Sequence, residues 1–170
     1  MKKIVVIEQI NSVENHIDEL SELLVQVVED GASVGFLPPM QASDARAYWE
    51  NLLSSEVLLF IAKINNQIVG TIQLHLCTKQ NGSHRAEIAK LMTHPEFRRN
   101  GIGRALMEKA EEFARKQGMT LIVLDTREGD PSNLLYSSMD YIEAGRIPLY
   151  AKSSDGQLHS TVFYYKIMSV

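Results

Sequence analysis

Two arginines lead into a Gly-Ile-Gly step within Arg98–Arg104, immediately before an amphipathic helical pattern. The first backbone N–H groups of a helix have no partner inside the helix, and the helix dipole adds partial positive charge at that end. Gly101 and Gly103 carry no Cβ, so a bulky anion can approach the backbone closely. The arginine side chains of the segment can reach phosphate oxygens. The segment therefore predicts a phosphate-binding site at the start of a helix.

Two common phosphate-binding motifs are excluded by the residues of this segment. The dinucleotide fingerprint needs a third glycine, and Leu106 stands at that position. The nucleotide P-loop needs Gly-Lys followed by Ser or Thr, whereas Arg104 follows Gly103 here. The pattern that remains is Arg98-x-x-Gly101-x-Gly103, which belongs to neither motif.

A carboxylate lies inside an apolar run, at Glu87 in RAEIAKLM. Burying a carboxylate is costly unless it is paired or functional, so Glu87 is a candidate general base, acting directly or through a water. It could instead pair with Arg85 or Lys90, or face solvent. Strict alternation along a strand would place Glu87, Ala89 and Leu91 on one face and Ile88, Lys90 and Met92 on the other.

Three polar residues follow the next apolar run. Asp125 ends that run, and the carboxyl ends of such strands face the ligand crevice of a sheet. Asp125 is therefore a second candidate base or an amine-binding carboxylate; the alternative is an Asx turn or a helix cap. On the short helix that follows, Asn133 could hold a ligand or the helix start, and Tyr136 could be a functional or a core tyrosine.

Other side chains carry weaker signals. Cys77 is the single cysteine and is expected to be an inert thiol rather than a nucleophile. We expect His159 to be a surface histidine rather than part of an acceptor site. Trp49 fits core packing and pocket lining equally well, and Phe36–Met40 could shape a pocket for an acceptor.

The positions of apolar residues and turn signals predict a mixed sheet flanked by helices, in the order β-α-α-β-β-β-α-β-α-β-β. Asn65-Asn66-Gln67 and Ser154-Asp155-Gly156 are typical of hairpin turns. The predicted strands cover 3–8, 57–64, 68–77, 85–92, 119–125, 141–151 and 158–168. One predicted helix begins at residue 17 and ends at 30–31. The other three predicted helices cover 41–54, 101–117 and 130–139.

Length and charge exclude several classes of protein. The chain has 170 residues, which suits one domain over 1–170. Its net charge of −4 argues against a nucleic-acid partner, and one cysteine excludes an internal disulfide. No residue spacing typical of a metal site is present, so we expect no metal. No apolar run approaches the ~20 residues that span a bilayer, and no signal-peptide core is present, so we expect no membrane partner and a cytoplasmic location.

The Arg98-x-x-Gly101-x-Gly103 pattern resembles the pyrophosphate-binding motif of the GNAT acetyltransferases, Q/R-x-x-G-x-G/A, and the element order resembles that family too. The resemblance implies an α/β (α+β) GNAT fold with a mostly antiparallel mixed sheet, and acetyl-CoA (coenzyme A) as co-substrate. The implied pyrophosphate cradle comprises Arg98, Arg99, Asn100, Gly101, Ile102, Gly103 and Arg104. The implied contacts to the rest of the coenzyme are Leu91, Met92, Thr93, Asn133 and Tyr136.

Four segments, GASVGF, RAEIAKLM, LDTREG and DGQLH, are similar to segments of the tabtoxin-resistance acetyltransferases, a group within that family. This likeness supports the fold more than the substrate. It makes an amino-acid toxin one candidate acceptor and leaves other amino acids and amines open.

The resemblance implies direct attack of an amine on acetyl-CoA in a ternary complex, with Glu87 or Asp125 as base and Tyr136 protonating the thiolate. One residue departs from the family pattern: Asp140 stands where the usual Y-x-x-x-G-F ending has glycine. We expect a small-molecule N-acetyltransferase, as a monomer or homodimer. The alternatives are a non-catalytic acyl-CoA-binding sensor and a protein or peptide N-acetyltransferase.

Overall fold

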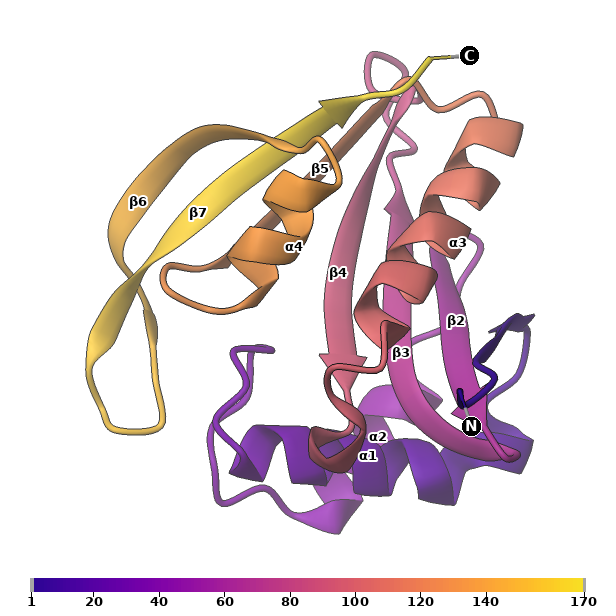
Figure 1. Ribbon diagram of the computed structural model, residues 1–170, viewed down its shortest axis with the longest axis vertical. Helices are drawn as coiled ribbons and strands as arrows, with labels where there is room; N and C mark the ends of the chain where they lie inside the picture. The colour runs from indigo at the N-terminus through magenta and orange to yellow at the C-terminus, as the bar shows by residue number, and fades with distance from the viewer. Residues whose placement is uncertain (1, 170) are drawn as a thin grey trace.

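The strands form one mixed sheet in the order β1-β2-β3-β4-β5-β7-β6 (Figure 1). Every neighbouring pair is antiparallel except β4 and β5, which run parallel. This confirms the predicted mixed, mostly antiparallel sheet. In the computed structural model, which describes residues 2–169, the strands are β1 (Val6–Ile10), β2 (Val57–Ile64), β3 (Gln67–Leu76), β4 (Arg85–Thr93), β5 (Leu121–Arg127), β6 (Ile142–Lys152) and β7 (Leu158–Ile167).

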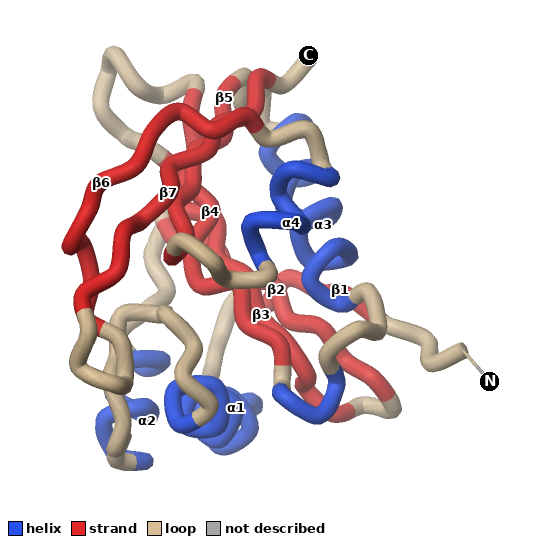
Figure 2. Tube along the Cα trace, turned by 60° about the vertical axis from the view of Figure 1, so that its left-hand side comes forward, coloured by secondary structure: helices blue, strands red, loops and turns tan. Residues whose placement is uncertain are grey.

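Helices cover both faces of the sheet (Figures 1 and 2). They are α1 (Ile17–Glu29), α2 (Ala42–Glu50), α3 (Ile102–Lys116) and α4 (Ser132–Ser138), with short 3-10 turns η1 (Glu14–His16) and η2 (Pro95–Phe97). One apolar core lies between the sheet and α1 with α2, and Trp49 is fully buried in it. The other core lies under α3 and α4. The two cores pack the sheet between two helical layers.

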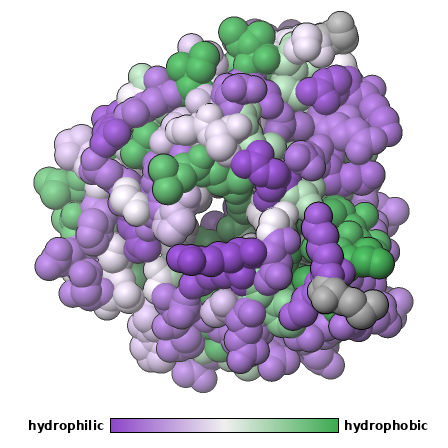
Figure 3. Space-filling model, viewed as in Figure 1, coloured by the Kyte–Doolittle hydropathy of each residue, from purple (hydrophilic) through white to green (hydrophobic). Residues whose placement is uncertain are grey.

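The only parallel strand pair described, β4 and β5, is joined over a short stretch. Arg85–Glu87 pairs with Leu121–Val123, and beyond these residues the two strands part (Figure 1). The space-filling view shows a hollow in this part of the molecule (Figure 3). The backbone of β4 past Glu87 is therefore open on the side that faces β5.

A β-bulge in β4 breaks the predicted alternation. Opposite β3, Ala89 pairs with Gln73 and Met92 with Thr71, which leaves one residue too many on β4. Lys90 has a left-handed backbone, with φ of +52°. The expectation that Ile88 and Met92 share a face was wrong: Ile88 lies in the core under α3, and Met92 lies in the core under α1. Beyond the extra residue, each side chain of β4 lies on the opposite face of the sheet from the one that regular alternation predicts.

Several predicted boundaries shift by a few residues. The first strand begins at Val6 rather than Lys3, because its pairing with β2 starts at Val6 and ends at the buried Ile10. The second helix ends at Glu50 rather than Ser54. The predicted Asn65-Asn66 hairpin is confirmed, since both asparagines have positive φ between paired strands.

Candidate active site

The turn before α3 leaves backbone N–H groups at the end of the helix without a side-chain cap. Gly101, the residue before the helix, has φ of +74°, and Arg99 is also left-handed at +64°. Asn100 Nδ2 donates to the carbonyl oxygens of Phe97 and Arg98 at 2.9 and 3.2 Å, which holds the turn. Among the described residues no side chain caps this end of α3. Such a turn can cradle an anion.

The three arginines of the turn have different surroundings. Arg98 pairs with Asp30 at the end of α1 at 2.6 Å, and Arg104 donates to the Ser138 hydroxyl at 2.6 Å. Arg99 is exposed. Arg98 therefore fastens the turn to α1, while Arg99 and Arg104 border the end of the helix. Gly103 lies close to α4, since a Cβ there would lie 3.3 Å from the Leu135 side chain, a tight contact.

Glu87 and Asp125 lie on the same face of the sheet, on either side of the split. Glu87 pairs with Val123, two residues before Asp125. The Glu87 side chain is exposed at this face, as one of the sequence alternatives allowed. Neighbouring groups still exclude part of its solvent, and this desolvation and then the negative charge of Asp125 raise the pKa of Glu87, while the positive charge of Lys90 lowers it. Thr161 donates its hydroxyl to Asp125 Oδ2 at 2.7 Å. The structure thus brings together the two predicted candidate bases.

Tyr136 approaches from α4, on the opposite face. Its ring is buried between those of Tyr141 and Tyr164, at centroid distances of 5.9 and 5.8 Å. Burial, together with the charges of Asp125 and Asp130, raises the pKa of Tyr136 well above its usual value. The phenol therefore keeps its proton at neutral pH and can act as a proton donor.

The departure at Asp140 does not alter the turn after Tyr136. Asp140 adopts the left-handed conformation that a glycine would take, with φ of +68°. The Tyr141 amide then donates to the Tyr136 carbonyl at 3.1 Å, closing the end of α4.

Sequence reasoning missed a hydrogen-bonded chain beside Glu87. Gln73 Nε2 donates to Tyr48 Oη at 2.8 Å, and Gln73 Oε1 lies 2.9 Å from His75 Nε2. The amide oxygen can only accept, so His75 Nε2 carries the hydrogen. Burial and then the charge of Lys90 lower the pKa of His75, so its neutral ring leaves Nδ1 as an acceptor. Two polar residues at alternate positions of an apolar strand were the available signal.

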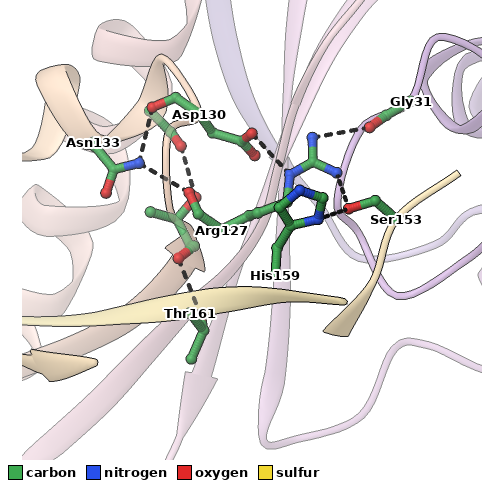
Figure 4. A network of polar contacts seen from close by, with 9 residues as sticks. Gly31, Arg127, Asp130, Asn133, Ser153, His159 and Thr161 are labelled. Atoms are coloured by element: carbon green, nitrogen blue, oxygen red, sulfur yellow. Dashed lines mark hydrogen bonds and ion pairs between the residues drawn. The ribbon is translucent and has the colours of Figure 1, made fainter. Parts of the chain in front are cut away.

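A second network, also missed, surrounds Arg127 (Figure 4). Its guanidinium donates to Asp130 Oδ1 at 2.9 Å, to Ser153 Oγ at 2.9 Å and to the Gly31 carbonyl at 3.1 Å. Ser153 Oγ also lies 2.7 Å from His159 Nδ1, so the expectation of a surface histidine was wrong: His159 is half-buried in this network. Arg127 thus joins three segments: the loop after α1, the β5–α4 turn and the β6–β7 hairpin.

Asn133 belongs to the start of α4. Its Nδ2 donates to the carbonyl oxygens of Arg127 and Asp130 at 2.9 Å each, and its Oδ1 accepts from Tyr164 at 2.8 Å. These contacts favour the helix-start alternative. A coenzyme contact by Asn133 stays a prediction.

A pocket of about 230 Å³ lies between the loop after α1 and the β6–β7 hairpin. It is lined by Val28, Gly31, Ala32, Ser33, Gly35, Phe36, Leu37, Pro38, Arg127, Ala151, Lys152, Ser153 and Ser154. The predicted loop residues Phe36 and Pro38 do line this pocket, whereas Trp49 belongs to the core.

Within residues 2–169, no three His, Cys, Asp or Glu side chains gather where they could hold a metal ion. No helix in the same range is long and apolar enough to cross a membrane.

Known proteins share both the sequence pattern and the fold. Residues 28–141 match the Acetyltransferase (GNAT) family. An uncharacterized N-acetyltransferase of Azospirillum brasilense, from the hisH-hisA intergenic region, is 27% identical over 128 residues, which are 73% of this chain and 76% of that protein.

Two solved structures superpose on nearly the whole chain. Ribosomal-protein-alanine N-acetyltransferase from Brucella melitensis has a TM-score of 0.79 and 19% identity, covering 96% of this chain and 99% of that one. YncA, a putative acetyltransferase from Salmonella typhimurium solved with its cofactor acetyl-CoA, has a TM-score of 0.79 and 14% identity, covering 97% and 94%. The uncapped turn at the start of α3 and the split between β4 and β5 fit an extended, phosphate-bearing coenzyme. The chain therefore belongs to the GNAT acetyltransferase family and is an acetyl-CoA-dependent N-acetyltransferase.

Proposed function

We propose that this enzyme acetylates a primary amine of a small, amino-acid-like or toxin-like molecule by direct transfer in a ternary complex. The observation that carries the proposal is the closure of the pocket beside the candidate bases. Arg127 joins the Gly31 carbonyl to Ser153 of the β6–β7 hairpin, and this link ties together two walls of the pocket. A small acceptor fits such a site better than a protein substrate does.

The turn before α3 holds the pyrophosphate in this proposal. The backbone amides of Arg99, Gly101, Ile102, Gly103 and Arg104 face that anion, and the exposed arginine side chains add charge. The backbone of Leu91, Met92 and Thr93 binds the pantetheine arm as an added strand would. The split from β5 leaves β4 open for this contact.

Acetyl-CoA supplies the thioester carbonyl that the amine attacks. The bulge at Lys90 interrupts the β3–β4 ladder, which leaves a backbone N–H near Met92 to polarise that carbonyl. Such an oxyanion contact is worth ~3 kcal/mol in acyl transfer.

Glu87 accepts the proton of the acceptor ammonium, whose pKa in free solution is near ~10 for an alkylamine. Its raised pKa makes it a better base than an ordinary carboxylate, and His75 Nδ1 or a water can relay the proton onward. Asp125, oriented by the Thr161 hydroxyl, attracts the ammonium group. Tyr136 returns a proton to the coenzyme thiolate from the other face.

Two alternatives remain open to experiment. A non-catalytic acyl-CoA sensor would need the turn before α3 but neither Glu87 nor Tyr136. A protein N-acetyltransferase would need an open groove; the superposition on a ribosomal-protein-alanine N-acetyltransferase, at 19% identity, shows only the shared fold.

Thiol release from acetyl-CoA separates these possibilities. Purified protein is incubated with a panel of free amino acids, their amides, simple amines and peptides with free N-termini. The proposal expects release with small amines at rates well above those with peptides. Release with peptides alone would contradict it in favour of protein acetylation. The absence of thiol release with every acceptor in the panel would contradict it in favour of the sensor.

Pairing of two copies is a further part of the proposal. Strand β6 lies at the edge of the sheet, and its side chains Ile142, Ile147, Leu149 and Tyr150 are exposed. These apolar residues support a homodimer that buries this edge. Light scattering at micromolar concentration should give twice the mass of the chain; a single-chain mass would contradict the pairing.

A further inference from the structure

The bulge in β4 places the Lys90 side chain beside the loop after α1. Regular alternation would have put it on the α3 face, beside Ile88. Instead its ammonium lies 5.9 Å from the ring centroid of Phe36, in the loop after α1. A Cβ on Gly35 would lie 3.1 Å from Lys90 Nζ, so the ammonium reaches the rim of the 230 Å³ pocket, which Gly35 and Phe36 line.

The charge of Lys90 has no close partner in the protein. Half-buried lysines elsewhere in the chain are paired: Lys63 with Glu8 at 2.6 Å, and Lys166 with Glu111 at 2.5 Å. Within residues 2–169, no carboxylate oxygen lies within 4 Å of Lys90 Nζ. A half-buried ammonium without a close counter-ion is costly, and an anion of a ligand would offset that cost.

Two carboxylates, Asp125 and Glu87, lie close enough to Lys90 to act on its charge. Asp125 and then Glu87 act on Lys90 through their negative charges, against the burial that lowers its pKa. Glu87 and Lys90 are three residues apart on one strand, and Asp125 lies across the split from them. Two carboxylates and one ammonium therefore lie near one another on this face of the sheet, and the ammonium adjoins the pocket through Gly35 and Phe36.

We propose that Lys90 binds an acidic group of the acceptor, so that the acceptor is a free amino acid or a similar molecule with an anionic group close to its reactive amine. This inference rests on the proposed function and narrows its acceptor class. The acceptor ammonium lies toward Glu87 and Asp125, its carboxylate lies toward Lys90, and its side chain enters the pocket that Phe36 lines. Polyamines and internal peptide amines lack the anionic group and are disfavoured.

The experiment compares each of several free L-amino acids with its own primary amide. Rates are corrected for the fraction of unprotonated amine, because amidation lowers the pKa of the α-amine. For wild-type enzyme we expect kcat/KM to favour the acid over the amide by about 10- to 100-fold, as for loss of one charge-assisted contact. Lys90→Met should abolish the preference by lowering kcat/KM for the acid alone, and Lys90→Arg should restore most of it.

Lys63→Met is the matched control, since Lys63 is also a half-buried strand lysine but is paired with Glu8. It should leave the acid-to-amide ratio unchanged. Turnover of amides or simple amines in preference to amino acids would overturn this inference while leaving the proposed function standing. An equal loss for acid and amide in Lys90→Met would also overturn it, because Lys90 would then act only on Glu87. No turnover with any small amine would overturn both.

Discussion

Replacing Arg127 with methionine tests whether the pocket walls depend on this one guanidinium. The side chain is only 19% exposed, and its ion-pair partner Asp130 is 23% exposed. The change removes three hydrogen bonds from a charged donor, one to a carboxylate and two to neutral oxygens. Hydrogen bonds that involve a charged group contribute at least ~1.5 kcal/mol each, and solvent recovers part of this at groups about one-fifth exposed, so the free energy of unfolding should fall by about 3 kcal/mol.

Urea denaturation and thermal unfolding measure this loss. For a chain of this length, it should lower Tm by roughly 6–12 °C. A double-mutant cycle with Asp130→Asn should give a coupling of about 1–2 kcal/mol, because the two groups are in direct contact.

Arg46→Met is the matched control. Arg46 also makes two ion pairs, with Asp18 and Glu50, but its side chain is 50% exposed. Exposed pairs contribute about 0–1 kcal/mol in total, so this variant should lose little stability.

The functional result should differ between the two substrates. Loosening Gly31 and Ser153 should raise KM for the acceptor and leave KM for acetyl-CoA nearly unchanged, because the turn before α3 is untouched. A loss of stability no larger than that of Arg46→Met, with the acceptor KM unaltered, would refute the view that Arg127 holds the pocket together.

Three further predictions follow from individual residues. The acid limb of kcat should lie above the ordinary carboxyl pKa, because desolvation and the negative charge of Asp125 raise the pKa of Glu87. Asp125→Asn removes that negative charge, so in a thiol-release assay the acid limb should move to lower pH. A move to higher pH would contradict the assignment of Glu87 as the base. Gly101→Ala should lower the free energy of unfolding in urea by ~1–2 kcal/mol, since φ is +74° and nothing obstructs a Cβ, and it should weaken coenzyme A binding in calorimetry. Gly118→Ala is the control: with φ of +78° beyond the other end of α3, it should lower stability by the same amount and leave coenzyme A binding unchanged. Asp140→Gly should raise the free energy of unfolding by ~0.5–1 kcal/mol by relieving the left-handed φ of +68°, and a destabilisation would show that the aspartate itself supports the turn.

The order of helices and strands was predictable because it depends on local periodicity and turn chemistry. Asn65-Asn66 sets a hairpin through its own backbone preference, and Gly31 and Gly118 follow the ends of α1 and α3 in left-handed conformations. The turn before α3 was also predictable, since its glycines and arginines are adjacent in the sequence.

What the sequence did not show depends on contacts between distant segments. The bulge at Lys90 exists only in the register of β4 against β3, so simple alternation assigned the wrong face beyond it. Arg127, Ser153 and Gly31 are far apart in sequence and meet only when the hairpin folds over the loop after α1. His75 was overlooked for the same reason, because its role depends on Gln73 and on Glu87 in the next strand.

The catalytic assignment is tested most directly by measuring kcat and the acetyl-CoA Kd of Tyr136→Phe beside those of Tyr141→Phe. Both tyrosines are buried with their rings tilted against each other, and the Tyr141 hydroxyl has no hydrogen-bond partner within residues 2–169. If Tyr136 protonates the thiolate, its variant should lose about 10²- to 10⁴-fold in kcat with Kd nearly unchanged, while Tyr141→Phe keeps wild-type kcat. Equal, small effects in the two variants would contradict the assignment and make Tyr136 a packing residue.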